Sequence, residues 1–156
     1  MTEKIFMSHS EDNTRELGRS LGENITAGIT VLLYGDLGAG KTVFVRGVCE
    51  AFGVSGVRSP SFTLINEYST PSGMYIIHAD LYRLESDGVY ALGLDEYTGS
   101  DDSVLFVEWP ERWNNPPSDD VIKIFFTALN EKEREIRIAA YGTKAQEVIG
   151  YEYSCC

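Results

Sequence analysis

The stretch of the sequence whose residue types point most directly to chemistry is YGDLGAGKT, residues 34–42. Gly35, Gly40, Lys41 and Thr42 have the spacing of a phosphate-binding loop, G-x-x-x-x-G-K-[ST]. Glycines let backbone N–H groups approach phosphate oxygens, and the helix that follows presents the positive end of its dipole. We predict that Lys41 reaches the β- and γ-phosphates of a nucleotide, that Thr42 ligates Mg²⁺, and that Lys41 faces solvent without ligand. The alternative is a tight turn with a solvated lysine.

Two predicted strands end in a carboxylate, YIIHAD at Asp80 and VLFVE at Glu108. In an open α/β sheet the carboxyl ends of the strands form the edge where ligands bind. Either acid could hold Mg²⁺ through water or orient an attacking water, and the sequence does not divide these roles. A solvated surface carboxylate is the alternative for each. His78 is flanked by apolar residues, so we expect it to pack within its strand rather than act as a base.

Other polar residues are weaker candidates. The loop SPSFT, residues 59–63, places three hydroxyl groups beside a proline and could sense a γ-phosphate, but an ordinary loop is an equal alternative. Arg58, Arg83 and Arg112 could stabilise charge, although most surface arginines only favour solubility. Trp109 could stack on a base or a partner, and core packing is the simpler expectation.

The elements that must position these residues alternate between strands and helices. The phosphate loop lies between an apolar run, residues 29–34, and a helix predicted at 41–53, which is the context that such a loop requires. The remaining predictions are a strand at 4–8, a helix at 8–25 capped by Ser8 and Glu11, strands at 62–69, 74–80 and 103–108, a helical turn region at 84–98, and a hairpin of 121–129 with 134–141. Together they predict a single α/β P-loop NTPase domain, with a mixed parallel and antiparallel sheet flanked by helices. We place the domain at residues 1–142 and a helical or frayed tail at 143–156.

Composition limits the possible functions. The 156 residues carry 13 basic and 24 acidic side chains, a formal charge of −11, which should repel a nucleic-acid backbone. No apolar stretch approaches the length of a membrane span, so we expect a soluble, cytoplasmic protein without a membrane partner. Cys49, Cys155 and Cys156 form neither a disulfide framework nor a zinc-site spacing, and the terminal pair is expected to fray.

Elimination narrows the class of nucleotide enzyme. No N-K-x-D guanine motif is present, no arginine-rich kinase lid stands out, and a compact ATPase remains. The segments GDLGAGKT, SPSFTLINEY, HADLYRL, LGLDEY and VEWPER follow in this order. With them the chain strongly resembles, over about residues 8 to 140, the TsaE (YjeE) family of bacterial P-loop ATPases, which support threonylcarbamoyladenosine modification of tRNA.

The resemblance implies an accessory ATPase that binds ATP and Mg²⁺, hydrolyses ATP slowly alone, and works with TsaD and TsaB, which hold the tRNA. It implies that SPSFT is a switch-like loop, in which Ser61 stands where the family usually has Thr. It also implies a site in which Lys41, Asp80 and Glu108 are catalytic, Thr42 and Glu108 serve the metal, and the nucleotide is bound by Leu37, Gly38, Ala39, Gly40, Lys41, Thr42 and Arg134. Two alternatives stay open: a nucleotide-gated binding module that needs no turnover, and a small-molecule kinase.

Overall fold

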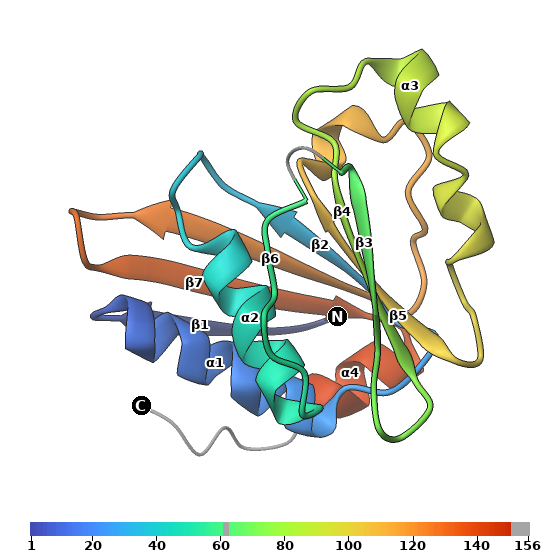
Figure 1. Cartoon of the computed structure of the whole chain (residues 1–156). Helices are drawn as coiled ribbons and strands as arrows, with labels where there is room; N and C mark the ends of the chain where they lie inside the picture. Colours follow the sequence, from blue (N-terminus) through green and yellow to red (C-terminus); the bar gives the residue numbers. More distant parts are fainter. Residues whose placement is uncertain (61–62, 151–156) are drawn as a thin grey trace.

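The strands of the chain form one mixed sheet in the order β1-β7-β6-β2-β5-β4-β3 (Figure 1). The computed structural model describes residues 1–60 and 63–150. The elements in these residues are β1 (Thr2–Ser8), α1 (Glu11–Asn24), β2 (Thr30–Tyr34), α2 (Lys41–Ala51), β3 (Ile65–Ser69), β4 (Tyr75–Asp80), α3 (Ser86–Ala91), η1 (Leu94–Glu96), β5 (Ser103–Glu108), η2 (Pro110–Arg112), β6 (Val121–Ala128), β7 (Arg134–Tyr141) and α4 (Thr143–Gly150). The predicted single α/β domain with a mixed sheet is confirmed.

Four parallel strands, β6, β2, β5 and β4, form the centre of the sheet, while β1, β7 and β3 pair antiparallel at its sides. Every residue of β5 is buried, as are the first four of β2, because both strands are covered on two faces. The carboxyl ends of the parallel strands meet at one edge, and the phosphate loop follows β2 at that edge. This edge is therefore where a ligand is expected.

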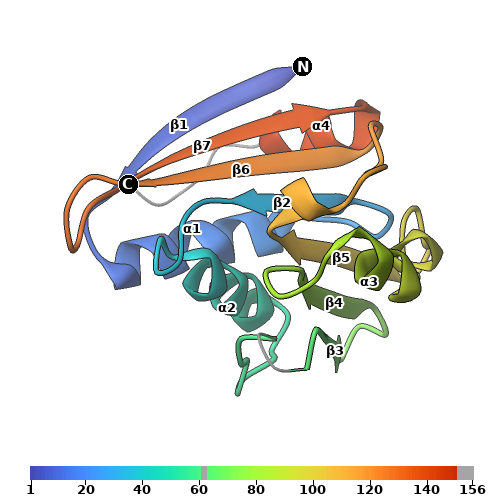
Figure 2. The ribbon, with the colours of Figure 1, turned by 90° about the horizontal axis from the view of Figure 1, so that it is seen from above.

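Helices α1 and α2 lie side by side (Figure 2) and share one apolar core with α4 and the sheet. Leu17, Leu21 and Phe44 are fully buried in it. The two helices approach closely at glycines: a Cβ on Gly18 of α1 would overlap the backbone carbonyl of Phe44, and one on Gly47 of α2 would overlap that of Arg15. A second core on the other face packs Leu81, Val89, Leu94 and Trp113 against the sheet.

Two predicted starts are wrong by three residues, those of α1 and β3. Helix α1 begins at Glu11 with Ser10 as its N-cap, and the Ser10 hydroxyl accepts the Asn13 N–H. Ser8 cannot cap α1 because it is the last residue of β1, paired with Arg134, and its hydroxyl is buried against that of Thr14 at 2.6 Å. Strand β3 begins at Ile65 rather than at 62, since the preceding Leu64 adopts a left-handed conformation with φ 70°. Residue 62, the first of the predicted strand, lies outside the described residues.

The end of the described chain is the helix α4, whose Ala145, Val148 and Ile149 are buried in the same core as α1 and α2. The division of the chain at residue 142 stays a prediction, and residues 151–156 with the two terminal cysteines lie outside the described residues. Within 1–60 and 63–150, no helix combines the length and the apolar composition that crossing a bilayer requires.

Candidate functional site

The phosphate loop connects the buried strand β2 to the first residue of α2. Gly35 and Gly40 have φ angles of 151° and 105°, backbone conformations that residues with a Cβ rarely adopt. Gly40 is the N-cap of α2 and supplies no side-chain acceptor for the first amides of the helix. These amides and the helix dipole suit an anion, so the loop has the backbone that phosphate binding needs.

The side chain of Lys41 does not face solvent, contrary to our expectation. It is only 4% exposed, its Nζ donates to the carbonyl oxygen of Gly35 at 2.6 Å, and it lies 4.1 Å from the centre of the Trp109 ring. Burial lowers the pKa of Lys41, and the carboxylates of Glu108 and Asp80 act against this shift. The indole of Trp109 and the loop carbonyl together provide an enclosed place for the ammonium group.

The two predicted carboxylates lie beside each other at the ends of adjacent strands. Asp80 on β4 is directly opposite Glu108 on β5 in the parallel register, and both side chains are buried. Glu108 Oε2 accepts a hydrogen bond of 3.2 Å from the Thr42 hydroxyl, and Asp80 Oδ1 accepts the Tyr82 N–H at 2.9 Å. The structure thus brings Thr42, Asp80 and Glu108 together next to the phosphate loop.

These oxygen donors fit a magnesium ion better than a transition metal. Hydroxyl and carboxylate oxygens are the ligands that Mg²⁺ prefers, and its nucleotide sites use one or two protein groups besides phosphates and water. No cluster of three or more His, Cys, Asp or Glu side chains suited to a metal is found in the residues that the structure describes. Thr42 and Glu108, completed by phosphates, are therefore the pair that could serve the ion.

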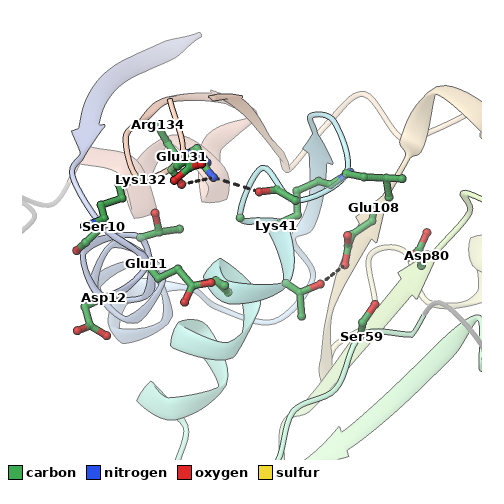
Figure 3. Close-up of a pocket in the computed structure, with 16 residues that line it drawn as sticks. Ser10, Glu11, Asp12, Lys41, Ser59, Asp80, Glu108, Glu131, Lys132 and Arg134 are labelled. Atoms are coloured by element: carbon green, nitrogen blue, oxygen red, sulfur yellow. Dashed lines mark hydrogen bonds between the residues drawn. The ribbon is translucent and has the colours of Figure 1, made fainter. Parts of the chain in front are cut away.

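A cavity of about 720 Å³ extends along the phosphate loop (Figure 3). In Figure 3, Glu108, Asp80 and Ser59 lie at one end and the α1 and β6–β7 residues at the other. Its lining residues are Ser10, Glu11, Asp12, Thr14, Leu37, Gly38, Gly40, Lys41, Thr42, Val43, Ser59, Asp80, Glu108, Glu131, Lys132 and Arg134. One end thus carries the carboxylate pair, and the other is bounded by the first turn of α1 and the β6–β7 connection.

Arg134, the first residue of β7, contacts the phosphate loop and lines the same cavity. Its guanidinium donates to the carbonyl oxygens of Gly38 and Ala39, both at 3.2 Å. Beside it, Glu133 accepts a 2.9 Å hydrogen bond from the His9 ring just before α1, and this bond lowers the pKa of Glu133. Both contacts hold the β6–β7 connection at the cavity mouth.

Of the weaker candidates, Ser59 lines the cavity and Trp109 contacts Lys41, whereas the three arginines lie outside the cavity. Arg58, Arg83 and Arg112 are exposed and do not line the cavity, and an Arg112 N–H donates to the Leu84 carbonyl. Ser59 of the SPSFT loop lines the cavity, whereas Ser61 lies outside the described residues. Trp109 is partly buried, as expected of a packing residue, yet it also covers Lys41. Its φ of 59° is rare for a bulky side chain and marks a strained backbone directly after Glu108.

Several lining residues were not among the sequence candidates, chiefly the N-cap Ser10 with Glu11 and Asp12 in the first turn of α1, and Glu131 and Lys132 of the β6–β7 connection. They belong to no motif, and only the three-dimensional arrangement brings them to the loop. His78 was expected to pack, and it is fully buried, but its Nε2 is also 2.7 Å from Glu108 Oε2. The i, i+2 spacing of His78 and Asp80 was the available signal, because both point to the same face of β4.

Comparisons of the sequence and of the fold with known proteins identify the family of this chain. The family model of the threonylcarbamoyl adenosine biosynthesis protein TsaE matches residues 8–136. The chain belongs to the TsaE family. A TsaE protein of Nostoc sp. is 39% identical over 94% of this chain and 91% of its own length, and one of Bacillus subtilis is 33% identical over 92% and 86%. The fold also matches the crystal structure of Bacillus subtilis YdiB, with a TM-score of 0.77, 29% identity, and coverage of 95% of this chain and 92% of that one.

Proposed function

We propose that this TsaE-family protein is an accessory ATPase that binds and slowly hydrolyses Mg-ATP in support of TsaD and TsaB during threonylcarbamoyladenosine modification of tRNA. The observation that carries the proposal is one cavity that joins the phosphate loop to the adjacent carboxylates Asp80 and Glu108. The relatives are named for tRNA threonylcarbamoyladenosine biosynthesis, and these names support the proposed role in that tRNA modification. The net charge of −11 supports a role in which the partners, not this chain, hold the tRNA.

In the proposed reaction ATP and water become ADP and phosphate. Residues Leu37 to Thr42 hold the phosphates, and Lys41 exchanges the Gly35 carbonyl for phosphate oxygens. Thr42 and Glu108 serve Mg²⁺, which when bound would neutralise charge on the β- and γ-phosphates. Asp80 or Glu108 orients the attacking water. The hydrogen bond that Lys41 must leave opposes ATP binding, and slow turnover by the isolated chain is what the family resemblance implies.

The nucleoside is assigned to the other end of the cavity. With the phosphates on the loop and the metal beside Glu108, the remaining volume lies between the first turn of α1 and the β6–β7 connection. Glu11 and Asp12 can accept hydrogen bonds from ribose hydroxyls there. Arg134 fixes the carbonyls of Gly38 and Ala39, so its proposed part in nucleotide binding is to shape the loop.

The decisive test is phosphate release by the purified chain, alone and with TsaD and TsaB, in wild type and Glu108→Gln. We expect Glu108→Gln to bind ATP and to release phosphate at least about 100-fold more slowly, the scale of a lost catalytic acid–base group. Glu147→Gln, which replaces an exposed acid on α4 that does not line the cavity, is the control and should behave as wild type. ATP binding without phosphate release in any mixture would instead leave a nucleotide-gated binding module, and phosphate on a metabolite would indicate a kinase.

A further inference from the structure

His78 is a buried polar residue to which the proposed mechanism gives no part. It lies on β4 opposite Phe106 of β5, one diagonal step from Glu108, which is itself opposite Asp80. Its side chain has 0% exposure, and its Nε2 is 2.7 Å from Glu108 Oε2. An imidazole in an apolar interior needs a partner, and Glu108 is the partner that the fold supplies.

The same carboxylate oxygen also accepts the Thr42 hydroxyl at 3.2 Å. Glu108 Oε2 is thus held from two elements, by His78 on β4 and by Thr42 at the start of α2. Two donors on one oxygen restrict rotation of the carboxylate about its terminal bond. We propose that His78 is a positioning residue that holds the Glu108 carboxylate in the orientation in which it serves Mg²⁺ with Thr42. This inference rests on the proposed function.

The geometry also selects the tautomer of His78. Nδ1 is buried and has no hydrogen-bond partner among the described residues. A proton on Nδ1 would therefore be buried unpaired, and the lone pair of Nε2 would face the carboxylate of Glu108. The Nε2–H tautomer avoids both penalties and makes His78 the donor to Glu108. In Figure 3 the Glu108 carboxylate lies beside Asp80 and is hydrogen-bonded to the Thr42 hydroxyl.

The test replaces His78 by residues that keep or remove the donor. Gln can place an amide N–H near the position of Nε2, whereas Leu fills space without a donor. The Mg²⁺ concentration that gives half-maximal ATP binding is measured by titration calorimetry, with ATP affinity in the absence of metal as reference. His78→Leu should raise that Mg²⁺ concentration about 10- to 100-fold, the range for lost outer-shell partners, and His78→Gln should stay close to wild type.

Ile76→Val is the matched structural control, because Ile76 is fully buried on the same strand and face. It should lower the unfolding temperature without changing the Mg²⁺ requirement. If His78→Leu fails to fold, His78→Gln is compared with His78→Asn, whose shorter amide cannot reach Glu108. A His78→Leu or His78→Asn protein with the wild-type Mg²⁺ requirement would overturn this inference alone. A wild type that binds ATP without any Mg²⁺ effect would overturn it together with the proposed metal site.

A second readout needs no nucleotide or metal. The chain has two histidines, His9 and His78, so a His9→Gln variant leaves one imidazole signal. The ¹⁵N spectrum of the ligand-free protein should show His78 protonated at Nε2 and unprotonated at Nδ1. Protonation at Nδ1 alone would contradict the donor role.

Discussion

At the scale of single residues, the resting position of Lys41 has the clearest consequence for function. Its ammonium group is bonded to the loop carbonyl of Gly35 and covered by Trp109. A phosphate must compete with that carbonyl for the lysine, whose pKa burial lowers while the carboxylates of Glu108 and Asp80 oppose that shift. Without a ligand, the loop carbonyl of Gly35 therefore occupies the Lys41 ammonium group, and a bound phosphate would have to replace this hydrogen bond.

Two substitutions of Lys41 distinguish the contribution of its apolar stem to stability from the contribution of its ammonium group to ATP binding. Lys41→Met keeps most of the apolar stem over Trp109, so its free energy of unfolding should stay within about 1 kcal/mol of wild type. Lys41→Ala also removes that stem and should be less stable by about 1–3 kcal/mol. Both should lose ATP binding. Urea unfolding and calorimetric ATP titration measure the two effects, and a Lys41→Ala protein as stable as wild type would argue for an exposed side chain.

Motif residues were predictable and their surroundings were not. The motif spacing of Gly35, Gly40 and Lys41 is a local sequence pattern. The structure has the predicted loop at these residues, directly before α2. The exposure of Lys41 was predicted wrongly because Trp109 covers it from another strand end, 68 positions away in the chain. The contact between His78 and Glu108 depends on the pairing of β4 with β5, which no local pattern encodes.

At the scale of elements, the close approach of α1 and α2 depends on glycines inside both helices. Glycine lowers helix propensity, so its presence at Gly18 and Gly47 is explained by packing rather than by local preference. Their missing side chains let the backbones of the two helices meet. Since α2 begins at the phosphate loop and α1 lines the cavity, this contact also sets the distance between the two walls of the site.

Gly18→Ala should separate the two helices. The new methyl group would overlap the carbonyl of Phe44, which is backbone and cannot rotate away. We expect a loss of about 1–3 kcal/mol in unfolding free energy, and weaker ATP binding through the displaced α1. Gly150→Ala at the end of α4, where a Cβ meets nothing within 4 Å, is the control and should be nearly neutral. Equal stability of both variants in urea would show that the helices can adjust.

Strands with unbroken apolar runs, such as β2 and β5, were predicted almost to the residue. The start of α1 was misplaced because β1 pairs with β7 as far as Ser8, and tertiary pairing overrides a local capping pattern. The order of the strands could not be derived, since it depends on which distant segments pair.

At the scale of the whole molecule, the core that joins α1, α2 and α4 isolates the thiol of Cys49 completely. Burial raises the pKa of Cys49 from 9.0 to about 12, with a smaller contribution from Glu50. The folded chain therefore retains this proton at a pH where the unfolded chain loses it. The stabilisation is complete below pH 9 and is lost as the pH rises from 9 toward 12.

The pH dependence can be measured on a Cys155→Ser/Cys156→Ser background, in which Cys49 is the remaining thiol. The difference in unfolding free energy between this protein and its Cys49→Ala variant should be constant from pH 7 to 8.5. Above pH 9 it should shrink by up to about 1.4 kcal/mol per pH unit. A difference that does not change with pH would mean that the thiol ionises equally in both states.

The pairing of β1 with β7 joins the first residues of the chain to some of the last, with Thr2 opposite Ala140. During synthesis β1 leaves the ribosome before β7, and the paired residues lie between 126 (Ser8 with Arg134) and 138 (Thr2 with Ala140) positions apart in the chain. Arg134, which braces the phosphate loop, emerges with that same strand. A chain that ended before β7 would therefore lack both the partner strand of β1 and the Arg134 contact with the loop.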